Sequence, residues 1–163
     1  MYSRASLVLL SGLLFTACGI DAGIPVPNTV DFEENLSAYK IYQGDMGSLN
    51  PSDDYQLLEL KSPLYSNYSL KQRLVYIPDG TKVTYIDNGI PDFPEGSILV
   101  KTFYYPVDER DAEQGHQVVE TRLEILSDDE WNVGTYVWNE EQTDAELILK
   151  GKDTTVSWID TTG

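Results

Sequence analysis

The sequence has very little of three things on which much protein chemistry depends. Its 163 residues include one cysteine, one histidine, and 11 basic residues against 27 acidic ones, which gives a formal net charge of -16 at pH 7. A single cysteine excludes a disulfide within the chain and a zinc site built on paired cysteines. The excess of carboxylates repels a phosphate backbone and argues against nucleic acid as a partner.

Sequence motifs of common enzyme classes are also missing. The chain contains no GxxxxGK[ST], GxGxxG, GxSxG or HExxH, the patterns that cradle phosphates, present a nucleophilic serine or bind catalytic zinc. We therefore expect no enzymatic activity and no catalytic residue.

The polar residues that remain are weak candidates for a metal site. His116 stands in the polar stretch DERDAEQGHQ and is predicted to be a surface histidine in a loop. Asp108, Glu109, Asp111 and Glu113 could bind calcium through hard oxygen atoms, but they lack the spacing of an EF-hand loop, and charged loops of this kind are usually solvated. We expect no metal site and no cofactor site in this chain.

The N-terminus carries an export signal. Arg4 precedes an apolar run that ends in Thr16-Ala17-Cys18-Gly19, a small-residue cleavage pattern. With a cysteine directly after the cut, this pattern resembles a bacterial lipobox, although Phe15 stands where leucine is usual. Residues 1–17 are predicted to be the signal peptide and Cys18 the lipidated residue. The alternative is an ordinary signal whose cleavage site happens to include a cysteine.

The residues after the signal divide into a tether and one domain. Residues 18–31 contain Pro25 and Pro27, which favour extended chain and suit a spacer next to a lipid anchor. Residues 32–163 are predicted to form a single β-rich domain, held at the periplasmic or cell-surface face of a bacterial membrane.

Alternating hydrophobic runs predict the fold class. Seven short segments rich in β-branched and aromatic residues are separated by turn residues, and short helical segments are expected near the start of the domain. In one run Val119, Thr121, Leu123 and Ile125 alternate with charged residues, as in a strand with one buried face. We expect a mainly β domain, an antiparallel β-sandwich or barrel. The seven predicted strands are RLVYI (73–77), TKVTYI (81–86), SILVKTFYY (97–105), VVETRLEIL (118–126), WNVGTYVW (131–138), AELILK (145–150) and TTVSWI (154–159).

The stretch TYVWNEEQTDAEL combines aromatic and acidic residues. Tyr136 and Trp138 are predicted to lie in a well-covered strand, while Asn139 and Glu140 begin a solvated turn. A glycosidase-like use of Glu140 or Asp144 is a third-ranked alternative, since nothing in the sequence places a partner carboxylate across a cleft.

Three segments together carry a family resemblance. PLYSNYSLKQRLVYIPDGTKVTYIDNGIPDFPEGSILVKTFYY (63–105), VVETRLEIL with the hairpin that follows it, and GTYVWNEEQTDAEL resemble the N-terminal, haem-free region of a family of bacterial exported di-haem c-type cytochromes. In some relatives a similar region is fused to quinoprotein sugar-dehydrogenase-like domains. The resemblance spans residues 36–160 and makes Tyr136, Trp138, Asn139 and Glu140 shared structural residues.

The resemblance implies a supporting function in electron transfer. In that family CxxCH motifs follow this region, so haem c is expected only in a C-terminal extension, while these 163 residues contain no such motif. The implied partners are a haem domain in the same gene product, a basic redox protein and, through Cys18, the membrane. The alternative function is a stand-alone carbohydrate-binding module that uses exposed aromatic residues such as Tyr104, Tyr105, Trp131 or Trp158.

Overall fold

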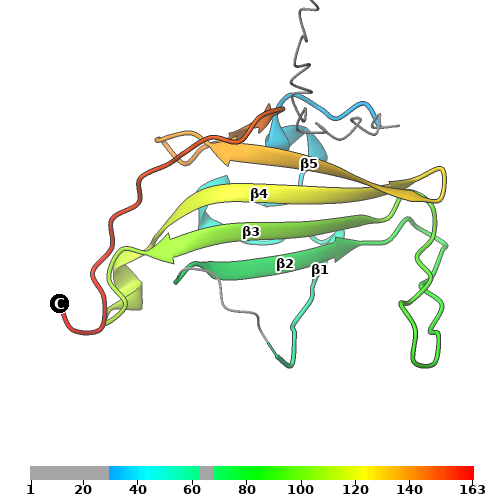
Figure 1. Cartoon of the computed structure of the whole chain (residues 1–163), viewed down its shortest axis with the longest axis horizontal. Helices are drawn as coiled ribbons and strands as arrows, with labels where there is room; N and C mark the ends of the chain where they lie inside the picture. The colour runs from blue at the N-terminus through cyan, green and yellow to red at the C-terminus, as the bar shows by residue number, and fades with distance from the viewer. Residues whose placement is uncertain (1–29, 63–67) are drawn as a thin grey trace, which may run out of the picture.

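The computed structural model describes residues 30–62 and 68–163, so Cys18, the signal peptide and most of the tether lie outside the described residues. The described chain forms one antiparallel sheet whose six strands are neighbours in the order of the sequence (Figure 1). The strands are β1 (Tyr55–Leu57), β2 (Leu70–Tyr76), β3 (Ile98–Pro106), β4 (His116–Ser127), β5 (Glu130–Trp138) and β6 (Ala145–Ile148).

The predicted mainly β, antiparallel class is confirmed, but the sandwich or barrel is wrong. All strands of the described chain belong to a single sheet that does not close on itself. The layer packed on it is not a second sheet, because residues 32–52 form irregular chain with two short 3-10 helices, η1 (Leu36–Tyr39) and η2 (Met46–Ser48). The expected N-terminal helical segments are therefore 3-10 turns.

Two of the seven predicted strands are not strands in the described chain. Residues 81–86 belong to the long β2–β3 loop, which projects beyond the sheet in Figure 1 and contains only an isolated bridge between Thr84 and Asp92. Residues 154–159 make a single bridge, from Ile159 to Asp108. Both segments have strand-like composition but lie beyond the ends of the sheet, where no neighbouring strand completes a ladder.

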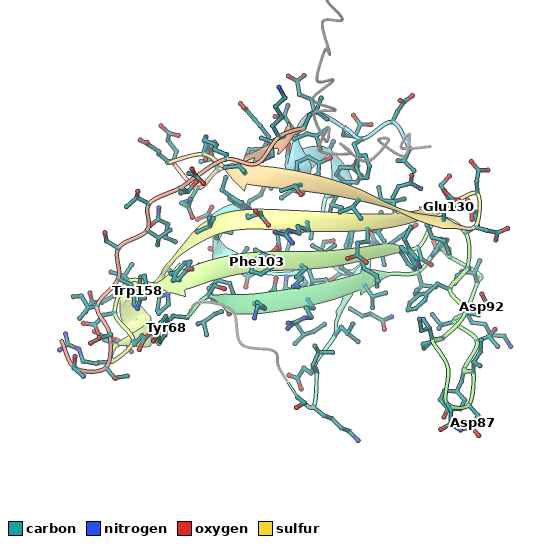
Figure 2. The ribbon with its side chains drawn as sticks, viewed as in Figure 1. Tyr68, Asp87, Asp92, Phe103, Glu130 and Trp158 are labelled. Atoms are coloured by element: carbon teal, nitrogen blue, oxygen red, sulfur yellow. The ribbon has the colours of Figure 1, made fainter. Side chains whose placement is uncertain are left out.

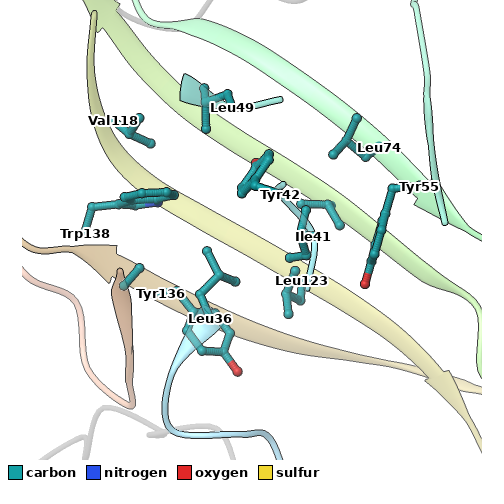
Figure 3. Packing of buried hydrophobic residues seen from close by; sticks show 12 residues of the cluster. Leu36, Ile41, Tyr42, Leu49, Tyr55, Leu74, Val118, Leu123, Tyr136 and Trp138 are labelled. Carbon is teal, nitrogen blue, oxygen red and sulfur yellow. The ribbon is translucent and has the colours of Figure 1, made fainter. Parts of the chain in front are cut away.

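The hydrophobic core lies on one face of the sheet, under residues 32–52 (Figure 3). This segment contributes Leu36, Ile41, Tyr42 and Leu49 to the buried cluster. In Figure 1 the segment lies behind the strands, so the viewer looks at the opposite face of the sheet. The core members from the strands are Tyr55, Leu74, Val100, Val118, Leu123, Tyr136, Trp138 and Ala145.

A buried chain of polar side chains joins the covering segment to three strands. The indole N–H of Trp138 donates to Thr121 Oγ1 at 2.9 Å, Thr121 and Thr102 share a hydrogen bond of 2.8 Å, and Thr102 shares one of 2.6 Å with the Tyr42 hydroxyl. Because each of these four side chains finds a partner, none of them adds the desolvation cost of an unpaired buried polar group. Burial raises the pKa of Tyr42 to about 12.

Gly134 allows the N-terminal segment to approach the sheet closely. A Cβ atom at this position would lie 2.6 Å from the ring of Phe32, closer than atoms pack. The glycine in the middle of β5 therefore has a packing reason, and the ring of Phe32 takes the place of its side chain.

A β-bulge in β4 makes the pattern of buried residues differ from the predicted alternation. Tyr104 pairs with Val118 and Phe103 with Glu120, so Val119 is an extra residue without a partner in β3. Thr121 and Leu123 face the core as predicted, but beyond the bulge it is Val118, and not Val119, that is buried. Alternation in the sequence cannot show where an extra residue shifts the pattern.

Within residues 30–62 and 68–163 no helix has the length and apolar character needed to span a membrane.

Candidate functional site

The sheet face opposite the core is the main candidate surface, and we call it the open face. In the described structure its side chains are the alternate residues of β2 to β6 that point away from residues 32–52, and none of them is buried. Figure 2 views the sheet from this side, with Phe103 near its middle. The open face comprises Lys71, Arg73, Val75, Leu99, Lys101, Phe103, Glu120, Arg122, Glu124, Val133, Thr135, Val137, Glu146 and Ile148.

Three cationic residues stand directly opposite one another across the open face. Arg73 pairs with Lys101, and Lys101 pairs with Arg122, on three neighbouring strands. We call these three residues the cationic row. Directly opposite side chains in a sheet lie about 5 Å apart at Cβ, and like charges at that distance repel. Lys71 lies two residues before Arg73 on the same face, and partial burial, Arg73 and Lys101 all lower the pKa of Lys71.

The charges of the row are only partly balanced. Arg122 forms an ion pair with Glu120 on its own strand. The charged ends of Lys101 and Arg122 lie 5.0 and 5.2 Å from the centroid of the Phe103 ring, within the range of cation–π attraction. No carboxylate of the described residues lies within 4.0 Å of the charged groups of Arg73 or Lys101.

A small hollow lies beside the row. It has a volume of about 130 Å³ and is formed where β2 and β3 meet. Its lining residues are Leu58, Arg73, Leu74, Leu99, Val100, Lys101 and Glu124.

Aromatic rings form a second cluster at one end of the sheet. Trp158, from the C-terminal segment, lies with its ring centroid 5.0 Å from that of Tyr105 and 6.0 Å from that of Tyr68. The indole N–H of Trp158 is buried and has no hydrogen-bond acceptor among the described residues. A hollow of about 260 Å³ next to this cluster is lined by Tyr68, Leu70, Pro106, Asp108, Glu109 and Ala112.

Two of the four aromatic residues named as possible ligand contacts come together in this cluster, namely Tyr105 and Trp158. Tyr104 packs against the core and lies 5.0 Å from the ring of His116. Trp131 lies near the far end of the sheet, in edge-to-face contact with Phe93.

The four residues of the family resemblance fall in the core and in one turn. Tyr136 and Trp138 are buried, and the Tyr136 hydroxyl donates to the carbonyl of Glu33 at 2.8 Å. Asn139 opens the β5–β6 turn, where its side chain accepts from the Thr143 amide N–H at 2.9 Å. Glu140 is exposed.

The predicted loop residues have structural contacts. His116 is not the surface loop histidine that the sequence predicted, because it is the partly buried first residue of β4 and its Nε2 lies 2.9 Å from the carbonyl oxygen of Gly47. Asp108 accepts two hydrogen bonds from the Arg110 side chain, which lower the pKa of its carboxyl to about 2. Within the described residues, no group of three or more histidine, cysteine or acidic side chains is placed to hold a metal ion.

Sequence reasoning missed the cationic row. The spacing of Lys71 and Arg73 does show that they share a strand face, but the row depends on the register between strands. Register is set by turns and bulges along the whole sheet, so the sequence alone did not align Arg73 with Lys101 and Arg122.

Comparison with known proteins adds no family assignment, since no family model, no curated protein and no solved structure matches the chain.

Proposed function

We propose that this chain is an accessory docking domain of an exported lipoprotein, which supports electron transfer by holding a haem-bearing protein or domain against its open face. The single observation that carries the proposal is the open face itself. One side of a six-stranded sheet has a packed core, while the other has no buried side chain among the described residues.

The composition of the open face supports docking. Aliphatic side chains, among them Val75, Leu99 and Val137, stand between charged ones. Antiparallel sheets with a solvated face usually carry polar side chains there, whereas protein contacts mix apolar and charged groups. The strand spacing and lengths of β2 to β6 give a face of roughly 20 by 23 Å, a substantial part of the ~800 Å² that each partner contributes to a typical interface.

The haem part of the proposal draws on the family resemblance. The chain itself offers no CxxCH motif, so any covalent haem belongs to the partner. Our proposal therefore gives this domain a positioning function and leaves the redox chemistry to the protein that it holds.

A crosslinking experiment in the exporting host tests this proposal. A photoreactive phenylalanine analogue is placed at Val133 on the open face and, as a control, at exposed Asp53 outside that face. We expect the Val133 position, and not Asp53, to give a crosslinked band that stains for covalent haem. A crosslinked band without haem would refute the electron-transfer part, and equal crosslinking from both positions would refute docking through the open face.

A carbohydrate-binding function is a second candidate, because the cluster of Tyr68, Tyr105 and Trp158 offers aromatic surface and a buried indole N–H without an acceptor. Sugar rings stack on aromatic faces, and their hydroxyls accept hydrogen bonds. Titration calorimetry with a panel of oligosaccharides tests it. Binding that is lost in Trp158→Ala but kept in Trp131→Ala would favour this function, and no binding to any member would refute it for that panel.

A further inference from the structure

The cationic row is unusual for this chain. Acidic residues outnumber basic ones by 27 to 11, yet the three basic residues of the row stand side by side on β2, β3 and β4 in the open face. Aligned like charges destabilise the sheet that carries them. The repulsion among these aligned cations, in a protein rich in carboxylates, indicates that another molecule supplies the negative charge that balances them.

The open face itself supplies only part of that counter-charge, since Glu120 pairs with Arg122 and Glu124 lines the hollow beside Arg73 and Lys101. No described carboxylate reaches Arg73 or Lys101 within 4.0 Å. Outside the described residues the sequence holds a single acidic side chain, Asp21.

We infer that the open face binds an acidic partner protein, whose aspartate or glutamate side chains contact Arg73, Lys101 and Arg122. This inference rests on the proposed docking function and specifies the chemistry of the partner surface. Arginine and lysine side chains bind carboxylates through charge-assisted hydrogen bonds. The hollow of about 130 Å³ is lined by Arg73 and Lys101 together with one carboxylate, Glu124, and its volume has room for one more carboxylate group.

The surroundings of the row favour a protein over an acidic glycan. The Phe103 ring, which a sugar would use for stacking, already has the charged ends of Lys101 and Arg122 about 5 Å from its centroid. The aliphatic residues Val75 and Leu99 lie in the next row of the open face, and they suit apolar side chains of a protein surface.

A second copy of this chain does not fit the same face in a symmetric dimer. In a two-fold interface the same patch meets itself, so face-to-face pairing of two copies would bring two cationic rows together. The charge of the row therefore disfavours a symmetric dimer through the open face, and we assign this face to a different protein.

Acidic peptide binding tests the inference. The full chain, purified in a nonionic detergent, is titrated into fluorescein-labelled hexaglutamate, with labelled hexaglutamine as the neutral probe, and fluorescence anisotropy is measured. We expect hexaglutamate alone to bind, with an affinity that falls as salt rises, because exposed charges are screened over about 10 Å at 0.1 M. The double variant Arg73→Gln/Lys101→Gln should weaken this binding at least tenfold.

The matched control is Lys150→Gln/Lys152→Gln, which changes the net charge equally at exposed positions outside the open face. We expect its affinity to stay within twofold of the parent chain. Equal weakening in both double variants, or no binding of hexaglutamate to the parent chain, would overturn the inference. Tighter binding of oligogalacturonate than of hexaglutamate would also overturn it and assign the row to an acidic glycan.

An NMR measurement on the unmodified chain tests the same contact without relying on variants that could change the fold. Addition of hexaglutamate should shift amide signals of Arg73, Lys101 and Arg122 more than those of Leu149 to Lys152, and shifts confined to other regions would contradict the inference. Crosslinking from Val133 to a haem protein with no peptide response would refute the acidic partner chemistry while the docking function stood. A peptide response at the cationic row, together with crosslinking from Val133 to a protein without haem, would support the acidic partner and refute the haem partner.

Discussion

Individual side chains in the core have distinct consequences for stability because their surroundings differ. Trp138 is 6% exposed and its indole N–H donates to Thr121, whereas Trp131 is 36% exposed on the rim of the sheet. The same residue type therefore lies in two environments within one strand. This contrast makes Trp131 an internal control for Trp138.

Trp138→Ala should lower the free energy of unfolding by about 3 to 5 kcal/mol, because it removes a large buried ring and one of the two hydrogen bonds of the Thr121 hydroxyl. Trp131→Ala should lower it by less than about 1 kcal/mol, since surface changes are usually small. Urea unfolding followed by circular dichroism measures both values. Equal midpoints for the two variants would show that Trp138 is not part of the core.

Tyr42 gives a prediction for alkaline pH. Its pKa rises from 10.0 to about 12 on burial, so the folded protein keeps the phenol protonated while the unfolded chain ionises above pH 10. Stability is therefore unaffected by this group below about pH 10 and falls between pH 10 and 12. In Tyr42→Phe this fall should be smaller by on the order of 2 to 3 kcal/mol.

Urea unfolding at pH 9, 10, 11 and 12 checks the alkaline prediction. Tyr85→Phe is the matched control, because Tyr85 is 78% exposed in the β2–β3 loop. The same pH dependence in Tyr42→Phe and the parent chain would contradict the assigned environment of Tyr42.

At the scale of the elements, the β5–β6 turn supplies hydrogen-bond partners for the backbone beside the bulge in β4. The side chain of Gln142 accepts the backbone N–H of Val118 at 2.6 Å and donates to the carbonyl of Val118 at 3.1 Å. The amide thus takes the place of a strand neighbour beside the bulge. The acidic stretch singled out in the sequence has structural contacts through Gln142 and through the Asp144 carboxylate, which accepts hydrogen bonds from the Ser37 backbone N–H and hydroxyl. Glu140 is exposed.

Gln142→Ala should cost about 1 to 3 kcal/mol for each backbone group of Val118 that is left without a partner. Glu140→Ala, two residues earlier in the same turn, should change stability by less than about 0.5 kcal/mol. Thermal melts of both variants are the measurement, with amide hydrogen exchange at Val118 as a local readout. Unchanged exchange at Val118 in Gln142→Ala would rule out this bridging contact.

At the scale of the whole molecule, the fold consists of one sheet with a covered face and an open face. The covered face provides the core that holds the six strands together. The open face is available for contact, and our proposals place both the docking function and the acidic partner there. The proposed membrane location rests on lipidation of Cys18, which lies outside the described residues.

Cys18→Ala should move the protein out of the membrane fraction or block its processing, because two acyl chains bind a bilayer with about 0.8 kcal/mol per buried CH₂. Thr16→Ser is the control, since it keeps a small residue before the cysteine. Fractionation after expression in a bacterial host, followed by immunoblotting, is the measurement. Normal processing and membrane retention of Cys18→Ala would exclude lipidation as the anchor.

The sequence by itself determined the antiparallel β class and the locations of most strands, because these depend on local alternation of apolar and polar residues. Runs such as VVETRLEIL and WNVGTYVW contain that information within a few residues. The same local information placed Trp138 and Tyr136 in a strand and Asn139 in a turn.

Only the tertiary structure decided what covers the sheet and which residues meet across it. The single layer results from residues 32–52 packing as irregular chain, and local pattern does not show whether such a segment or a second sheet covers a hydrophobic face. The bulge at Val119 and the alignment of Arg73, Lys101 and Arg122 depend on register across strands far apart in the sequence. Register is fixed by the packing of the whole sheet, since a one-residue shift would turn every side chain to the other face.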